Sequence, residues 1–192
     1  MMTSYDPTYL DEFKSQTPEY INNELTRGNK QFKYEPTLFS NDSTDDIADR
    51  KRAFVVRQKD MKEGTIGQII LGSAPGFINL KQGHVTKCDV MKKDGTILIE
   101  VKNKWNTCNS DSTSKVLDKL AVYKREHPNA ECIWGIINPR NGFEGVNETI
   151  IHRGVEIKKI QGLKLFSKVF THSGNDYSQE AIKFVKEELS KY

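Results

Sequence analysis

Residues 85–102 constrain the fold of this chain most strongly, because they have the pattern of a β-hairpin. The pair Asp94-Gly95 favours a two-residue type I′ turn, which needs positive φ at both central positions. After the turn, aliphatic and polar residues alternate, and this period of two is typical of a strand with one buried face. The polar positions of that strand include Glu100 and Lys102, and its aliphatic positions are Ile97, Ile99 and Val101.

The register of this hairpin predicts that two carboxylates and an ammonium group converge on one face. With a two-residue loop, Asp89 lies directly opposite Glu100, which puts their Cβ atoms about 5 Å apart. Lys102 shares the face of Glu100 and lies about 6.5 Å further along the strand. Carboxylates this close repel each other unless a cation lies between them, and Mg²⁺ binds few carboxylates together with waters and phosphate oxygens.

Two hypotheses follow from this polar face. In the first, Asp89 and Glu100 hold Mg²⁺, and Lys102 orients a water or stabilises charge on a phosphate, which predicts metal-assisted phosphodiester hydrolysis. In the second, the same side chains form weak cross-strand pairs on a solvated surface. The hairpin by itself leaves both hypotheses open.

The composition of the chain fits one α/β domain with a hydrophobic core, since 192 residues are enough to build one. The net charge of +3, from 29 basic and 26 acidic residues, is compatible with a nucleic-acid partner without requiring one. The three cysteines are widely spaced, which favours a reducing, cytoplasmic location and argues against a zinc knuckle. The chain shows neither a signal peptide nor a membrane-spanning run, so we expect an intracellular protein with no membrane partner.

Helices and an arm are predicted before the hairpin. Residues 6–28 have the pattern of two short helices, with Pro18 near the start of the second. Residues 30–41 interleave lysines with aromatic rings, so this arm either packs over an edge of the core or contacts DNA. Residues 43–71 predict a long helix that starts with acidic residues. Glu63, late in this helix, either adds an acid to the metal site or faces solvent.

Helices and strands alternate in the rest of the chain. A helix capped by Ser112 or Thr113 is predicted to follow the hairpin. Lysines lie off its core stripe at positions 115, 119 and 124, and they either form a solvated face or contact phosphates. We predict further strands over residues 77–80, 132–137, 149–151 and 155–160, and further helices over residues 163–170 and 181–192.

The predicted order of helix, strand, hairpin, helix and strand resembles the PD-(D/E)XK nuclease superfamily. Asp89 lies on one hairpin strand and Glu100-Val101-Lys102 on the other, as in that superfamily. Residues 100–107 and the run Trp134-Gly-Ile-Ile-Asn138 are similar to a group of type II restriction endonucleases. The resemblance implies a restriction-endonuclease-like α/β fold, with an αβββαβ core, a mixed central sheet flanked by helices, and extra N- and C-terminal helices.

The resemblance also implies roles for individual residues. Asp89 and Glu100 are expected to bind Mg²⁺, for which Mn²⁺ can substitute, and Lys102 is expected to assist the attacking water. Glu63 matches the additional helix acid that some members use. The chain is therefore expected to be a single nuclease domain over residues 1–192. It would comprise N-terminal helices and an arm (1–43), a catalytic core (44–138), and C-terminal strands and helices (139–192).

The function that this resemblance implies is that of a Mg²⁺-dependent type II site-specific deoxyribonuclease. Such an enzyme makes double-strand breaks at a specific sequence and leaves 5′-phosphates. One set of catalytic residues engages one strand, so a homodimer on double-stranded DNA is expected. Two alternatives stay open: a structure-specific repair or junction-resolving nuclease on the same core, and a catalytically silent DNA-binding module. The candidate DNA-binding residues are Asn103, Lys104, Trp105, Asn106, Lys115 and Arg140.

Overall fold

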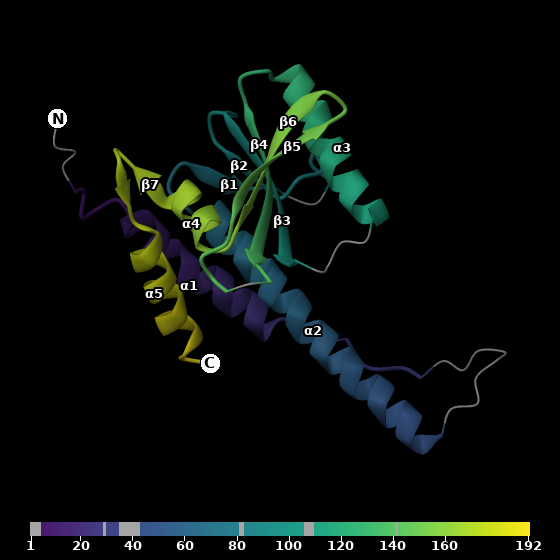
Figure 1. Cartoon of the computed structure of the whole chain (residues 1–192). Coiled ribbons are helices and arrows are strands. Elements are labelled where there is room, and N and C mark those ends of the chain that lie inside the picture. The colour runs from purple at the N-terminus through teal and green to yellow at the C-terminus, as the bar shows by residue number, and fades with distance from the viewer. Residues whose placement is uncertain (1–4, 29, 35–42, 81–82, 106–109, 141) are drawn as a thin grey trace.

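A mixed six-stranded sheet forms the centre of the protein in the computed structural model (Figure 1). The structure describes residues 5–28, 30–34, 43–80, 83–105, 110–140 and 142–192. The strands of this sheet are β1 (Phe77–Asn79), β2 (Val90–Lys92), β3 (Ile97–Lys104), β4 (Glu131–Asn138), β5 (Asn147–His152) and β6 (Val155–Gln161). Their spatial order is β1-β2-β3-β4-β6-β5, and β4 is parallel to both β3 and β6, whereas the other neighbours are antiparallel. The predicted mixed central sheet is confirmed.

Helices cover both faces of this sheet (Figure 1). One face is covered by α3 (Ser110–Glu126). The opposite face is covered by α1 (Asp11–Thr26), α2 (Thr44–Gly72), α4 (Leu163–Phe170) and α5 (Ser178–Leu189). Each face therefore has its own apolar core. Strand β3 contributes Leu98 to the α3 side and Ile99 to the other side, and both side chains are fully buried.

A single helix, α1, takes the place of the two short helices that the sequence predicted. Pro18 lies inside it, although proline removes a helical hydrogen bond and crowds the preceding turn. The helix continues because Leu10, Phe13 and Ile21 are almost completely buried, and the stripe that they form runs past the proline at helical spacing. Tertiary burial thus outweighs the local preference of Pro18.

The long helix α2 begins where the sequence predicted. The Oγ atom of Ser43 accepts a hydrogen bond from the backbone N–H of Asp46 at 3.2 Å, and the Asp46 carboxylate accepts one from the backbone N–H of Ser43 at 2.8 Å. This reciprocal capping box satisfies two donors at the start of the helix. The buried residues of α2 are confined to the part from Ile66 to Gly72, so its first half projects from the body of the protein (Figure 1).

The hairpin of β2 and β3 has the predicted register. Val90 pairs with Ile99, so the same count places Asp89 next to Glu100. The first strand is shorter than predicted, because residues 85–89 are not in the sheet and β2 begins at Val90. Asp89 therefore lies in a bend at the entrance to β2, and not within a regular strand.

The turn of this hairpin differs from the predicted type I′ turn. Residues 93–96 separate the two strands, and φ is positive at Gly95 (74°) but not at Asp94. The Asp94 carboxylate accepts hydrogen bonds from the backbone N–H of Thr96 at 2.9 Å and from its hydroxyl at 2.6 Å. These local bonds stabilise a longer turn. The observed turn takes up one more residue from each strand than the predicted two-residue turn. The register of the strands is therefore unchanged.

The downstream strands lie within two residues of their predicted bounds. A short hairpin of β7 (Thr171–His172) and β8 (Asn175–Asp176) was not predicted, because strands of two residues carry no periodic pattern. Its turn has positive φ at Ser173 (48°) and Gly174 (80°), as a type I′ turn requires. None of the helices in the described part of the chain is long and apolar enough to cross a membrane.

Gly67 provides a test of how α2 packs on the sheet. A Cβ atom at this position would lie 2.0 Å from Cδ1 of Ile137. We expect Gly67→Ala to lower the free energy of unfolding by about 1–3 kcal/mol, because the added methyl group overpacks this contact. Adding Ile137→Val removes the clashing carbon and should recover part of the loss. Chemical denaturation measures both effects, with Gly28→Ala as the control because a Cβ atom there has nothing within 4 Å. A loss that is independent of Ile137→Val would contradict this packing.

Candidate active site

The entrance to β2 and the middle of β3 place Asp89 and Glu100 at one site. The Oδ2 atom of Asp89 accepts a hydrogen bond from the backbone N–H of Val101 at 2.7 Å. The backbone N–H of Asp89 donates to the carbonyl of Ile99 at 3.1 Å. These two bonds on either side of Glu100 hold Asp89 against β3. The structure therefore brings together the two carboxylates that the sequence singled out.

Glu100 is the least exposed charged residue in the described part of the chain, at 2%. Its Oε1 atom accepts hydrogen bonds from Lys102 Nζ at 2.6 Å and from Lys119 Nζ at 3.0 Å. Lys119 also donates to the carbonyl of Lys87 at 2.9 Å. Two ammonium groups on one carboxylate oxygen provide the charge compensation that a buried carboxylate needs.

Lys119 belongs to this site, although we predicted no more for it than for the other lysines of its helix. It lies on α3 between Val116 and Leu120, which are both buried against the sheet. A lysine at the border of a buried stripe projects towards the strand that the stripe covers. Its position beside the buried stripe, on the helix that directly follows β3 in the chain, is the sequence signal that could have placed Lys119 near Glu100.

The second oxygen of Glu100, Oε2, is buried and has no hydrogen-bond partner among the residues that the structure describes. A buried acceptor without a partner is costly, and a bound cation would satisfy it. Asp89 and Glu100 offer oxygen ligands only, which are the ligands that Mg²⁺ prefers. Within the described residues no three His, Cys, Asp or Glu side chains gather in a metal-binding group. A cation on this pair would therefore keep water or substrate oxygens as its remaining ligands, as Mg²⁺ usually does.

Burial and the neighbouring charge of Glu100 raise the pKa of Asp89. The N–H of Val101 and the two lysines, Lys102 and Lys119, oppose this shift without cancelling it. Ionisation of Asp89 is therefore less favourable in the cation-free folded protein than in the unfolded chain, and a divalent cation would relieve this cost. The adjacent thiol plays no part in this balance, because burial raises the pKa of Cys88 to about 12.

Comparison with known proteins assigns the chain to a family. The Eco47II restriction endonuclease family model matches residues 14–179. This chain belongs to the Eco47II restriction endonuclease family. It is also 32% identical over 71 residues to the type II restriction enzyme Sau96I of Staphylococcus aureus. That match covers 37% of this chain and 26% of the relative, so the chain spans about a quarter of the length of the relative that it matches. The predicted resemblance and fold class are confirmed.

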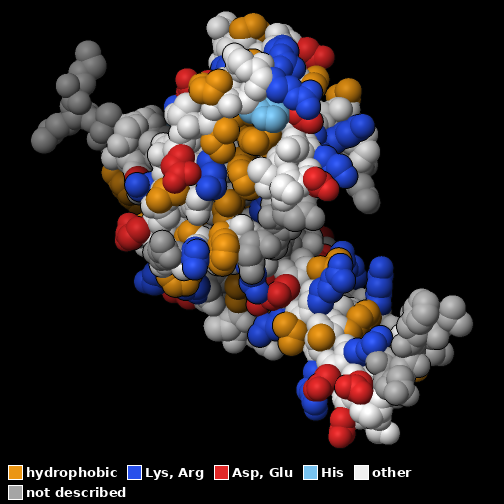
Figure 2. Space-filling model, turned by 45° about the vertical axis from the view of Figure 1, so that its right-hand side comes forward, with side chains coloured by type: hydrophobic (Ala, Val, Ile, Leu, Met, Phe, Trp, Pro, Cys, Tyr) orange, Lys and Arg blue, Asp and Glu red, His pale blue; other side chains and the backbone are white. Residues whose placement is uncertain are grey.

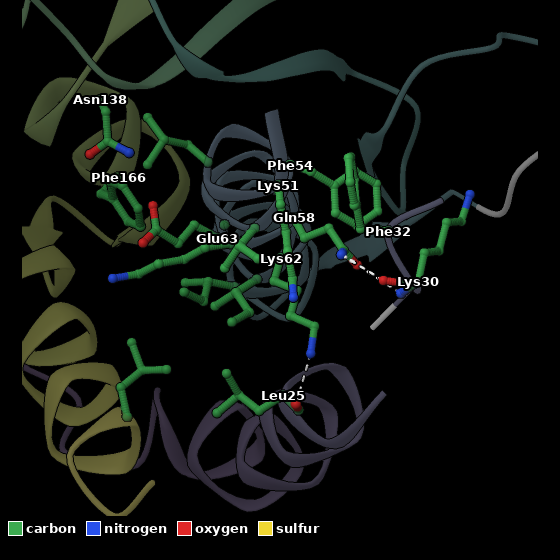
Figure 3. A pocket seen from close by; sticks show the side chains of 17 residues that line it. Leu25, Lys30, Phe32, Lys51, Phe54, Gln58, Lys62, Glu63, Asn138 and Phe166 are labelled. Carbon is green, nitrogen blue, oxygen red and sulfur yellow. Dashed lines mark hydrogen bonds between the residues drawn. The ribbon is translucent and has the colours of Figure 1, made fainter. Parts of the chain in front are cut away.

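Glu63 lies away from the acid pair in this member of the Eco47II family. It lines a cavity of about 740 Å³ beside α2, together with side chains such as Phe54, Phe166 and Asn138 (Figure 3). Helix α2 covers the face of the sheet opposite to α3, whereas Glu100 points to the α3 side. The structure therefore does not bring Glu63 to Asp89 and Glu100, and this arrangement gives no support to its predicted role as an extra metal ligand.

Two of the candidate DNA-binding residues are used to hold β3 against α2. Lys104 Nζ forms an ion pair with Asp60 at 2.7 Å, and Asn103 donates to the carbonyl of Asp60 at 3.0 Å. Asn103 also accepts a hydrogen bond from Asn138 at 2.8 Å. These contacts fix the end of the strand that carries Glu100. Asn106 lies outside the described residues.

The other candidate DNA-binding residues remain on the surface of this Eco47II family member. Trp105 is 46% exposed, and the guanidinium carbon of Arg140 lies 4.9 Å from its ring centroid. Lys115 is exposed on α3. Residues 50–59 of α2 add a stretch with five basic and no acidic side chains. Figure 2 shows Lys and Arg side chains on the projecting part of the molecule, across a hollow from others on its body.

The raised pKa of Asp89 predicts that Asp89→Asn stabilises the cation-free protein at neutral pH. The unfolded chain releases this proton at a lower pH than the folded protein does. The contribution of Asp89 to wild-type stability therefore falls as pH rises from about 4, the unfolded value, through the raised pKa of the folded state. Asparagine removes this loss and retains an oxygen for the Val101 N–H.

Thermal melts in chelator measure this effect. We expect a higher Tm for Asp89→Asn than for wild type at pH 7, and a difference that shrinks as pH falls below about 4. The control is Asp111→Asn, at an exposed position on α3. A difference of the same size at both pH values would contradict this assignment.

Proposed function

We propose that this chain is a Mg²⁺-dependent DNA endonuclease of the type II restriction class. It would cut double-stranded DNA at a specific sequence and leave 5′-phosphates. The observation that carries this proposal is the geometry of Glu100, which is buried beside Asp89 with one oxygen on two lysines and the other oxygen without a partner. Membership of the Eco47II restriction endonuclease family supports the substrate class.

The roles of the side chains follow from their contacts. Asp89 and Glu100 would hold the cation, which, when bound, polarises the scissile phosphate and lowers the pKa of a water. Lys102 keeps 27% of its side chain exposed while bonded to Glu100. It can therefore orient an attacking water and donate to a phosphate oxygen as negative charge builds there. Lys119 anchors the same carboxylate oxygen from α3 and fixes the direction of Glu100.

We further propose that the enzyme acts as a homodimer. The described residues contain one such acid pair, and one acid pair cuts one strand. A target with two-fold symmetry is matched by a symmetric pair of proteins. The dimer surface would come from the N-terminal or the last two helices, so that the Glu100 site stays open to DNA.

The central experiment measures cleavage of an unmethylated DNA in Mg²⁺ by wild type and by single variants. We expect discrete fragments from wild type, and losses of about 10²–10⁴-fold or more for Asp89→Asn, Glu100→Gln and Lys102→Gln. Glu126→Gln is the matched control, at an exposed position at the far end of α3. The losses should occur without loss of the folded state in thermal melts.

Several results would contradict the proposal. A smear of fragments indicates a non-specific nuclease, and cutting confined to branched or damaged DNA indicates a repair or junction-resolving enzyme. Absence of cutting by well-folded wild-type protein indicates a silent DNA-binding module. Full activity of Glu100→Gln, or full activity in excess chelator, would show that the catalytic centre lies elsewhere.

The basic stretch of α2 predicts a measurable salt dependence of DNA binding. Lys51, Arg57 and Lys59 take part in none of the ion pairs between described residues. Each contact to a phosphate contributes about 0.9 to the slope of log K against log salt. Replacing all three with glutamine should therefore reduce the slope by up to about 2.7.

The control for this change in charge is a triple glutamine variant at Lys93, Arg125 and Arg153, which are exposed and lie outside α2 and outside the helices proposed for the dimer surface. Fluorescence anisotropy with a labelled duplex at several salt concentrations gives both slopes. Equal slopes for the two triple variants would show that the projecting part of α2 does not contact DNA.

A further inference from the structure

A row of side chains crosses the sheet from the acid pair towards the opposite edge, which β5 forms. Glu100 of β3 is in register with Trp134 of β4, which is in register with Lys159 of β6. Residues in register on adjacent strands point to the same face and lie about 4.8 Å apart. Trp134 is therefore the direct neighbour of Glu100 on the α3 side of the sheet, and Lys159 lies one strand further away.

A cavity of about 310 Å³ lies along this row. Trp134 and Lys159 line it, together with Gln161 at the end of β6, Trp105 directly after β3, and Arg140 two residues after the end of β4. Two acidic side chains, Glu144 and Glu148, also line it. The cavity is thus at the carboxyl ends of the parallel strands β3, β4 and β6, where ligands of α/β sheets commonly bind. It is also beside the acid pair and not part of it, because neither Asp89 nor Glu100 lines it.

Trp134, one of the residues that line this cavity, carries a hydrogen-bond donor without a partner in the described part of the chain. Trp134 is only 8% exposed, and its indole N–H is buried without a hydrogen-bond partner among the described residues. A buried donor without a partner costs free energy, so a ligand that supplies an acceptor would be favoured here. Both tryptophan rings of the chain line the cavity, each with a cation close to its ring: Arg140 at 4.9 Å from Trp105 and Lys159 at 5.5 Å from Trp134.

These features together fit a flat aromatic ligand that has polar atoms along its edge and is attached to a phosphodiester backbone. Aromatic walls stack on such a ligand, and the indole N–H can donate to an acceptor atom on its edge. Arg140 suits an adjacent phosphate, whereas Lys159 is paired with Glu148 of β5 at 3.3 Å. A free anion would explain Arg140 but not the two rings, and it would be repelled by Glu144 and Glu148 in the lining. An apolar ligand would leave the Trp134 donor unsatisfied.

We propose that this cavity is a nucleobase pocket, which takes one base of the DNA close to the scissile phosphate. Trp134 is its specificity-determining residue, through a hydrogen bond from the indole N–H to an acceptor on the base. The inference rests on the proposed nuclease function and deepens it, because it assigns part of the sequence discrimination to a position one strand away from Glu100.

The experiment is a double-mutant cycle, in which the indole N–H of the protein and one acceptor atom of a base are removed separately and together. Trp134→Phe removes the N–H and keeps an aromatic ring. Once the cut site has been mapped, every base near the cut is replaced in turn by an analogue that lacks one acceptor atom. We expect wild type to lose roughly fivefold to tenfold in kcat/KM at one position. The Trp134→Phe enzyme should cut that modified duplex and the unmodified duplex at nearly the same rate.

The matched control is Trp105→Phe, which removes the indole N–H of the more exposed ring. It should retain the sensitivity of wild type to the same base analogue. Two results would overturn the proposal. The first is a Trp134→Phe loss that is the same on every duplex, since this would mean that the indole supports Glu100 and not a base. The second is a set of analogue losses that do not depend on Trp134.

A second measurement needs neither cleavage nor a Trp134 substitution. Because the chain has two tryptophans, Trp105→Phe leaves Trp134 as the single indole reporter. Titration of this variant with a duplex in Ca²⁺ should change the Trp134 emission in parallel with binding measured by anisotropy. Binding without any change in emission would overturn the pocket, even if wild type cuts DNA. Absence of cutting with a full change in emission would instead contradict the proposed nuclease function alone.

Discussion

The interaction on which this structure depends is the contact of a buried carboxylate with two lysines in the middle of β3. Glu100 is 2% exposed, and it lies between the fully buried Leu98 and the partly exposed Lys102 on the same side of the strand. A carboxylate at this depth destabilises a fold unless opposite charges and hydrogen bonds compensate it. Lys102 from the same strand and Lys119 from α3 supply that compensation for one oxygen only. The remaining oxygen is the reason to expect a cation.

Both faces of the sheet contribute to this site, although the acid pair lies on one of them. The α3 face supplies Lys119, which joins the helix to Glu100. On the other face, Asp60 of α2 binds Lys104 and Asn103 at the end of β3. The strand is thus held on both sides immediately around Glu100 and Lys102. This support fits the requirement that catalytic groups keep a fixed geometry.

The sequence predicted those parts of the site that depend on local pattern. The alternation after Asp94-Gly95 fixed which side chains share a face, and the opposition of Asp89 to Glu100 needed only a count along two strands. The predicted turn type was wrong, because Asp94 bonds locally to Thr96. The longer turn nevertheless leaves the predicted register of the two strands unchanged. Features that depend on tertiary contacts were not accessible in the same way.

Three cases illustrate this limit. Pro18 signalled a helix start, but the burial of Phe13 and Ile21 carries α1 past it. Glu63 has the sequence position of a helix acid, but only the packing of α2 reveals that it lies on the opposite face from Glu100. Lys119 could be told from the other lysines of α3 only by its place beside the buried stripe.

The most direct test of the account is to locate the cation itself. Crystals of the protein with a duplex and Mn²⁺, whether the duplex is cut or not, would give an anomalous difference map that marks the metal independently of any activity assay. We predict a peak between the carboxylates of Asp89 and Glu100, in contact with the Oε2 atom that lacks a partner among the described residues, and no such peak in Glu100→Gln crystals. A Mn²⁺ peak at other side chains, with none at this pair, would contradict it.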